Sequence, residues 1–271
     1  MKYASDRIPR FLEAHRTMLR ETHDWVRGAG PLRGIGVTVP FALFLHILQL
    51  GRALQLLCEE GYADSGGPLV RSMVNTAVNM LAICRKDSEA LALQYLAFSI
   101  VRRRKYTDNF IKNGLLTLEA LGDYEEKAAE RERDVLAKYA KAGVEPRRLG
   151  GDNRTWLGLN DADLFKYVDA TPWYEVHYAP LSDDVHANVS AIAPELRGMD
   201  AGAVTTGPRW TDPLLLLSAS VDVVGHATEE LAKYLNHRPE EAADIRKRAR
   251  DAALTAISDA ADEAREELPP V

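Results

Sequence analysis

The chain has 271 residues, of which 46% are hydrophobic and 27% are charged, shares that are ordinary for a globular protein. A chain of this length can bury a full core without disulfide staples, so the composition excludes a disulfide-stapled scaffold. The net charge of −6 argues against a broad nucleic-acid footprint, although it permits local basic patches.

The two cysteines, Cys58 and Cys84, indicate a reducing compartment, and we interpret both as buried apolar thiols. The first residues are charged throughout, so no signal peptide is expected. The most apolar run, Val37–Leu48, contains Pro40 and His46 and falls short of the roughly 20 residues that a membrane span requires. We therefore expect a cytoplasmic protein without a membrane partner.

Abundant alanine and leucine, few aromatic residues and repeated helical periodicity predict an all-α fold. We expect a single multi-helix bundle of about seven or eight helices, formed as one domain over 1–271. Within it, 1–36 hold an N-terminal helix and a glycine-rich connector, 40–237 a core bundle and 238–271 a C-terminal helix. The expected helices cover 6–27, 40–61, 68–85, 89–113, 115–142, a segment after Pro180, 212–236 and 239–266, and a short helix is expected at 161–169.

Four of these apolar helices each carry a line of polar residues. The lines run over His46–Arg52, Arg71–Asn79, Ser182–Ser190 and Ser218–His226. An uncompensated buried polar group costs about 1–3 kcal/mol, so we predict that the lines converge on one satisfied network or pocket. Separate lines that face outward are the alternative.

The densest polar stretch is Trp173–Ser190. Pro180 disfavours an α conformation at Ala179, so a helix is predicted to begin just after it. On that helix His186 follows Ser182 by one turn. A histidine there suits proton transfer, whereas capping acids beside a surface histidine are the plain alternative.

A family resemblance rests on two short segments. Tyr178, Leu181-Ser182 and Val185-His186 resemble the tyrosine, leucine-serine and histidine signature of the bacterial helical domain-of-unknown-function family 5677. An arginine-serine pair on an earlier helix of that family is matched by Arg71-Ser72. Asn75 stands where the family often has a glutamate. The resemblance implies a helical fold.

A more distant likeness is to the HEPN ribonuclease superfamily, whose motif places an arginine four to six residues before a histidine on one helix. The segment LSDDVH ends as that motif does, but it contains no arginine, so Arg71 from another helix is the candidate. The resemblance implies a metal-independent endoribonuclease, in a defence or stress locus, that binds RNA.

Under this hypothesis His186 acts as general acid or base and Arg71 stabilises the charge of the phosphorane. The complete set of candidate catalytic residues is His186, Arg71, Ser182, Tyr178 and Asn75. The candidate substrate-binding residues are Arg102, Arg103 and Lys105 of the basic cluster 102–105, together with Trp156, which we expect to plug the core or cover a pocket.

Two other hypotheses stay open. The first is a non-catalytic helical binding or oligomerisation module, and the long C-terminal helix suits a homo-oligomer. The second is a metal-dependent enzyme. No cofactor is predicted, and the ligands available to a divalent metal are His177, Asp183, His186, Asp222 and His226. Asp222 and His226 are one turn apart, which equally suits a satisfied Asp–His pair in the core.

Overall fold

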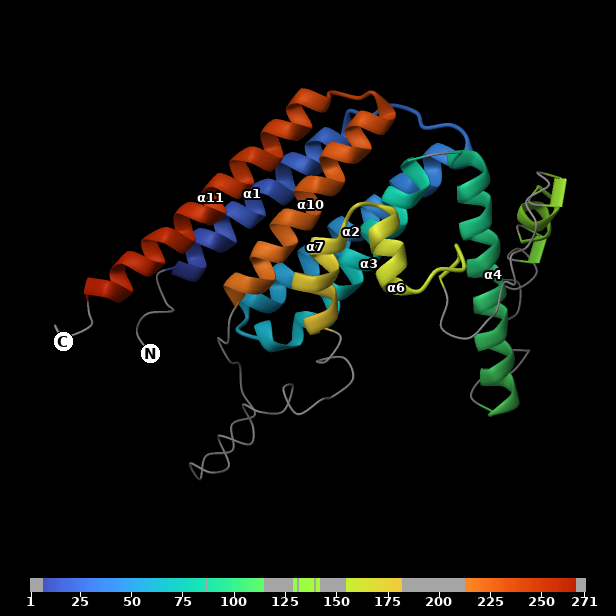
Figure 1. The fold of residues 1–271 in the computed structure, drawn as a ribbon, viewed down its shortest axis with the longest axis horizontal. Coiled ribbons are helices and arrows are strands. Elements are labelled where there is room, and N and C mark those ends of the chain that lie inside the picture. The colour runs from blue at the N-terminus through green and yellow to red at the C-terminus, as the bar shows by residue number, and fades with distance from the viewer. Residues whose placement is uncertain are drawn as a thin grey trace. The chain divides into compact units, whose positions relative to one another are not determined.

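The computed structural model describes residues 7–85, 87–114, 129–130, 132–138, 140–141, 155–181 and 213–266. Every element in these ranges is a helix, which confirms the all-α prediction (Figure 1). The chain divides into two units. Unit 1 comprises Met1–Leu32, Phe41–Leu81 and Thr171–Val271, and unit 2 comprises Arg33–Pro40 and Ala82–Ala170.

The helix bounds follow the sequence pattern closely. Unit 1 contains α1 (Arg7–Arg27), most of α2 (Ile35–Glu59) and of α3 (Gly67–Cys84), the 3₁₀ turn η1 (Ala63–Ser65), α7 (Thr171–Trp173), the π-helical η2 (Tyr174–Tyr178), α10 (Pro213–Leu235) and α11 (Pro239–Glu266). Unit 2 contains α4 (Ser88–Lys112) and α6 (Asp161–Tyr167). Of the predicted helix 115–142, the described residues 129–130, 132–138 and 140–141 are helical.

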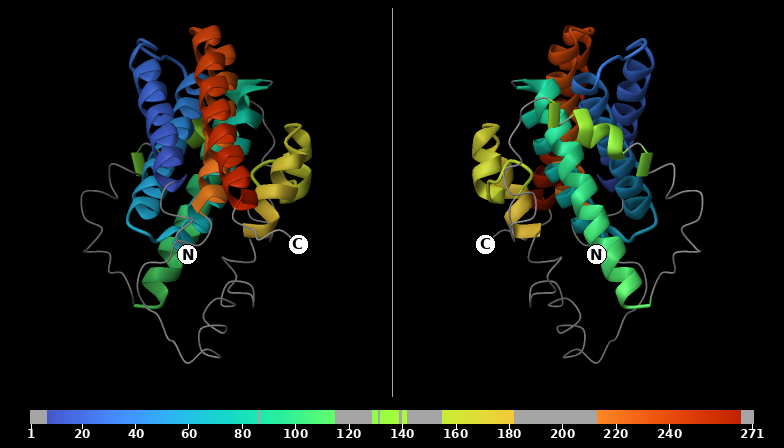
Figure 2. Two further views of the ribbon diagram at one scale, coloured as in Figure 1. Left: turned by 90° about the vertical axis from the view of Figure 1, so that its left-hand side faces the viewer. Right: turned by 90° about the vertical axis from the view of Figure 1, so that its right-hand side faces the viewer.

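The first and last helices of the chain pack together in unit 1. Contacts join α1 to α11 and both of them to α10, and Figure 2 shows α11 alongside α1 from two further sides. Helix α3 is buried along nearly its whole length, and Met73, Val74, Ala77 and Val78 are fully buried. The C-terminal helix is therefore part of the core packing of unit 1.

Polar groups in this core form a closed network around His15, which is fully buried on α1. Its Nδ1 lies 3.2 Å from Oε1 of Gln55, and its Nε2 lies 2.7 Å from Oγ of Ser220. Gln55 in turn donates to Glu59 at 2.7 Å, which fixes the orientation of its amide. His15 therefore donates through Nδ1 and accepts the Ser220 hydroxyl proton at Nε2, as a neutral imidazole.

Two glycines allow the close packing around η1 and α2. A Cβ at Gly66 would lie 2.6 Å from Leu54 Cδ1 and 2.9 Å from Leu216 Cδ1, distances at which neighbouring side chains must move. A Cβ at Gly51 would lie 3.2 Å from Leu19 Cδ2. These small residues therefore set how near the helices of unit 1 approach.

The second helix begins earlier than predicted. The apolar pattern predicts a start at residue 40, but α2 starts at Ile35, and the carbonyl of Gly34 accepts from the backbone of Thr38. Pro40 lies in the second turn of α2, where it removes the hydrogen bond to the carbonyl of Gly36 and so weakens the helix at that point. The full 25-residue helix is long and apolar enough to cross a membrane by length and composition alone, a test that the core helix of a soluble protein also passes.

The polar line predicted on α2 faces outward. His46, Gln49 and Arg52 are all exposed, so this line does not join a shared interior network. The physical reason is that α2 buries its opposite face, with Phe44 and Ile47 inside. Of the two cysteines, Cys58 is buried, which raises the pKa of its thiol to about 12, whereas Cys84 is half-buried.

Unit 2 is organised around the start of α4. Asp87 caps that helix by accepting from the Ala90 backbone amide at 3.5 Å. Trp156 is buried, as the sequence predicts: its ring meets Tyr95 edge-on, and its carbonyl accepts from Gln94 at 2.9 Å. Trp156 thus anchors the segment that leads into α6.

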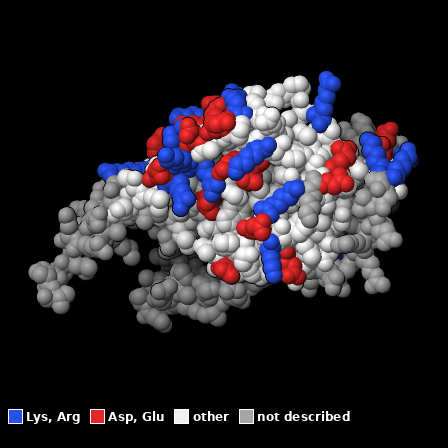
Figure 3. Space-filling model, turned by 45° about the horizontal axis from the view of Figure 1, so that its top comes forward, with Lys and Arg blue, Asp and Glu red and all other residues white. Residues whose placement is uncertain are grey.

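The charged side chains of the described surface are mixed in sign. On the face drawn in Figure 3, acidic and basic groups lie next to one another. Arg16 pairs with Glu59 at 2.7 Å and Arg248 with Glu21 at 3.0 Å, so both pairs link separate helices of unit 1. Such exposed pairs contribute little to stability, but they exclude a broad basic surface here.

Candidate functional site

A short irregular helix links the two polar clusters of unit 1. Residues 171–173 are α-helical, 174–178 form a π turn, and 179–181 are helical again. The π turn is closed by the backbone amide of Ala179, which donates to the carbonyl of Tyr174. Turns of this kind are rare, occur mostly as single turns inside α-helices and are frequent at functional sites.

The expectation that a helix begins after Pro180 is wrong. Ala179 has φ −65° and ψ −47°, an α conformation, and the helix continues through residue 181. A proline in a regular helix clashes with the carbonyl four residues earlier and removes one hydrogen bond. The π turn, in which each hydrogen bond spans five residues, lies directly before Pro180. This wider turn is how the helix accommodates the proline ring.

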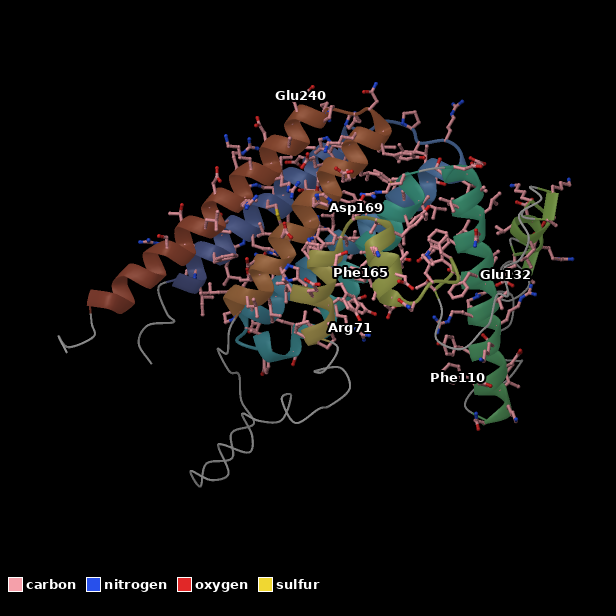
Figure 4. All side chains as sticks on the ribbon, viewed as in Figure 1. Arg71, Phe110, Glu132, Phe165, Asp169 and Glu240 are labelled. Atoms are coloured by element: carbon pink, nitrogen blue, oxygen red, sulfur yellow. The ribbon has the colours of Figure 1, made fainter. Side chains whose placement is uncertain are left out.

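Arg71 of α3 is held against this segment. Its Nη2 donates to Oη of Tyr178 at 3.3 Å, and its guanidinium carbon lies 4.8 Å from the centre of the Tyr178 ring. Tyr174 stacks on Tyr178 with ring centres 5.7 Å apart. Figure 4 labels Arg71 close to the yellow segment that carries these tyrosines. Two of the candidate residues named from the sequence, Arg71 and Tyr178, are therefore in contact.

The guanidinium of Arg71 is only partly satisfied by its neighbours. Its Nε is buried and has no hydrogen-bond partner among the residues that the structure describes. A buried charged donor without a partner is costly, and a guanidinium offers a planar fork that fits carboxylate or phosphate oxygens. The arrangement can therefore receive an anion.

A second cluster surrounds Asp222 of α10. Trp173 donates from Nε1 to Oδ2 of Asp222 at 2.7 Å, and Nε2 of His177 lies 3.9 Å from the same oxygen. The ring of His226, one turn after Asp222, meets the Trp173 ring edge-on at 5.2 Å. Asp222 thus fixes the indole of Trp173 and lies beside the histidine of the π turn.

Both histidines of this cluster favour the neutral form. Burial lowers the pKa of His177, although the charge of Asp222 opposes that shift. Burial and the nearby charge of Arg246 lower the pKa of His226, against the opposing carboxylates of Glu230 and Asp222. In the neutral state each imidazole can accept a proton, and Nδ1 of His226 is buried without a partner among the described residues.

Arg246 of α11 reaches this cluster because Gly225 leaves room for it. A Cβ at Gly225 would lie 2.8 Å from Cγ of Arg246. Arg246 pairs with Glu229 at 2.5 Å and lies 4.0 Å from Oδ1 of Asp222. An arginine and an indole donor therefore both face the carboxylate of Asp222.

Other predicted site residues are placed differently. Asn75 is exposed one turn after Arg71, and its backbone carbonyl accepts from Asn79 at 2.8 Å. Ser182, Asp183 and His186 lie outside the described residues, so their meeting with Arg71 stays a prediction. The predicted convergence is observed for α3 and α10 in one respect: each reaches the same π turn, through Tyr178 and His177.

The metal hypothesis gains no support from the described part of the chain. Within those ranges no group of three or more histidine, cysteine, aspartate or glutamate side chains is placed to hold a metal ion. Of the five predicted ligands, His177, Asp222 and His226 are described, whereas Asp183 and His186 are not. The cofactor prediction therefore stays open.

The basic cluster 102–105 lies on α4 in unit 2. Arg103 and Arg104 both pair with the buried carboxylate of Glu132, and the Arg104 contact measures 2.8 Å. These ion pairs, together with hydrogen bonds, lower the pKa of Glu132 against the opposing effect of its burial. Arg102 and Lys105 are exposed. Two of the four cations, Arg103 and Arg104, are therefore paired within the protein.

The sequence alone does not identify two residues of the site, Trp173 and Arg246, or the buried core histidine His15, because nothing local marks their partners. Trp173 is paired with an aspartate 49 positions away, and Arg246 approaches through a glycine on another helix. His15 meets a serine 205 positions later. A lone histidine at an apolar helix position is the only signal that could have been noticed.

Comparison with known families matches the chain to the model described as "Family of unknown function (DUF5677)" over residues 37–202, more than half of its length. The chain belongs to DUF5677. The DUF5677 match includes Arg71 and Tyr178 but ends before Asp222, His226 and Arg246. No curated protein and no solved structure matches the chain.

Proposed function

We propose that this DUF5677 protein is a metal-independent endoribonuclease of HEPN-like type, whose site combines Arg71 with His186. The observation that carries the proposal is the setting of Arg71: it is held under Tyr178 with a buried Nε that has no partner among the described residues. Such a guanidinium suits the negative charge that develops during phosphoryl transfer.

The reaction needs no co-reactant. The ribose 2′-hydroxyl loses its proton and attacks the adjacent phosphorus, and the 5′-oxygen leaves with a proton, giving a 2′,3′-cyclic phosphate and a 5′-hydroxyl. His186 is assigned the proton transfers, and Arg71 the stabilisation of the charged phosphorane. Tyr178 orients Arg71, while Ser182 and Asn75 are assigned to position the phosphate.

The test is cleavage of labelled RNA in EDTA by purified full-length protein. We expect Arg71→Lys to slow cleavage by about 100-fold or more, because a point charge does not replace a planar fork. Arg52→Lys, at an exposed position on α2, is the matched control and should leave the cleavage rate unchanged. Wild-type protein that cleaves no RNA in EDTA contradicts the proposal.

A second candidate, a helical binding or oligomerisation module, is favoured by exposed apolar residues of unit 1. Leu45 and Leu56 lie three turns apart on the outer face of α2, and Tyr62 follows that helix. Under this reading the wild type self-associates or binds a partner through α2. Sedimentation of the wild type against Leu56→Lys tests it: identical monomer behaviour in both excludes self-association through this face.

A further inference from the structure

The outer face of α4 carries a regular series of aromatic and basic side chains. Phe98, Arg102, Tyr106 and Phe110 follow at steps of four residues, which places them on one side of the helix. Tyr106 is 52% exposed and Phe110 is 50% exposed. Figure 4 labels Phe110 near the end of α4. We call these four residues the α4 stripe.

The arginine within the α4 stripe is oriented by its aromatic neighbours. Its guanidinium carbon lies 5.5 Å from the centre of the Phe98 ring and 5.9 Å from that of Tyr106. It also donates to Oη of Tyr106 at 3.1 Å. Contacts of this kind hold an exposed cation in place without neutralising it.

The four cations of the basic cluster 102–105 differ in whether a carboxylate pairs with them. Arg103 and Arg104 are paired with Glu132. Arg102 and exposed Lys105 have no carboxylate partner among the residues that the structure describes. Two positive charges therefore remain available next to two exposed aromatic rings, on a chain whose net charge is −6.

We propose that the α4 stripe is a binding platform for single-stranded RNA. Unpaired bases stack on exposed rings, and cations between the rings meet the phosphates that separate those bases. Positions four residues apart on a helix are roughly 6 Å apart along its axis, a spacing that lets neighbouring bases reach successive rings. The bases of a duplex are already stacked, so a duplex does not fit. The choice of RNA over DNA rests on the proposed function.

The experiment measures affinity by fluorescence anisotropy, using a labelled RNA oligonucleotide without secondary structure. The full-length protein carries His186→Ala in all samples so that the RNA stays intact. We expect Tyr106→Ala/Phe110→Ala to bind at least about tenfold more weakly, because each lost stacking contact reduces affinity substantially. Tyr106→Leu/Phe110→Leu keeps apolar bulk without rings and should be weakened equally.

The charge contribution is tested by salt dependence. For single strands each lost phosphate contact reduces the slope of log affinity against log salt by about 0.7, so Arg102→Ala/Lys105→Ala should reduce it by roughly 1.4. The control Arg20→Ala/Arg52→Ala removes the same charge from exposed positions on α1 and α2, and it should leave the slope unchanged.

Wild-type affinity in either Tyr106/Phe110 variant overturns the platform, as does equally tight binding of duplex RNA. Equal affinity for single-stranded DNA retains the platform and overturns its assignment to RNA. Cleavage is scored separately with an intact His186. Binding that depends on the α4 stripe, without cleavage, contradicts the proposed function and supports the platform. Cleavage together with unchanged binding in the stripe variants supports the proposed function and contradicts the platform.

Discussion

The buried network around His15 predicts how the stability of unit 1 depends on pH. Burial lowers the pKa of His15 from 6.5 to about 4, against the opposing effects of Gln55 and Glu59. When the pKa of a group is lower in the folded chain than in the unfolded chain, its contribution to stability is complete at any pH above the unfolded pKa. That stability is lost as the pH falls from about 6.5 towards about 4.

The magnitude follows from proton linkage. At about pH 5 the unfolded histidine is almost fully protonated and the folded one is not, which costs about 2 kcal/mol of unfolding free energy. The full shift corresponds to roughly 3 kcal/mol by about pH 4 and below. Because a domain is typically stable by about 5–15 kcal/mol, this loss is readily measured.

The assay is urea unfolding followed by far-UV circular dichroism at about pH 7.5 and about pH 5. His15→Gln removes the titrating group, so the variant should be less stable at the higher pH but lose about 2 kcal/mol less on acidification. The comparison uses the pH-dependent difference, which is insensitive to the packing defect of the variant. His46→Gln on the exposed face of α2 is the matched control. Equal acid sensitivity of wild type and His15→Gln would refute the reasoning.

Three further predictions concern the described contacts. Trp173→Phe removes the donor to Asp222 and should cost roughly 1 kcal/mol of unfolding free energy, measured by urea unfolding, because that carboxylate is partly exposed and regains water. Gly66→Ala should cost about 1–3 kcal/mol in the same assay, since its Cβ would overlap Leu54; unchanged stability would show that the leucine moves freely. Glu132→Gln weakens the hold on Arg103 and should raise the salt dependence of RNA binding, whereas an unchanged slope would show that this arginine does not reach the strand.

Much of the fold could be predicted because its signals are local. Asp87 caps α4 and Asn160 caps α6, each by accepting from a backbone amide three residues later. Pro239 opens α11 at the predicted position. Capping side chains and helix-opening prolines act within one turn, so the sequence alone reveals them.

The errors arose where tertiary packing overrode a local rule. Pro180 predicts a helix start, yet it lies inside a helix, and so does Pro40, the residue at which the second helix is predicted to begin. The π turn at 174–178 accommodates the ring of Pro180, and no local sequence pattern predicts such a turn. The outward direction of His46 likewise depends on which face of α2 meets the core, and periodicity alone does not decide between two mixed faces.

The candidate site could be predicted only in part. The family resemblance named both Arg71 and Tyr178, and the structure shows that the two side chains are in contact. The hydrogen bond between Trp173 and Asp222 joins elements that are distant in sequence, and no local pattern around either residue predicts it. Pairings of this kind depend on how the helices pack against one another. The sequence therefore predicts candidate residues but not which of them are in contact.

The central claim, that Arg71 and His186 belong to one site, is tested most directly by a double-mutant comparison of RNA cleavage in EDTA under single-turnover conditions. If they act together, Arg71→Lys and His186→Ala each slow cleavage by about 100-fold or more, and the double variant is no slower than the slower single variant. Losses that multiply in the double variant, or full activity in His186→Ala, would contradict the claim.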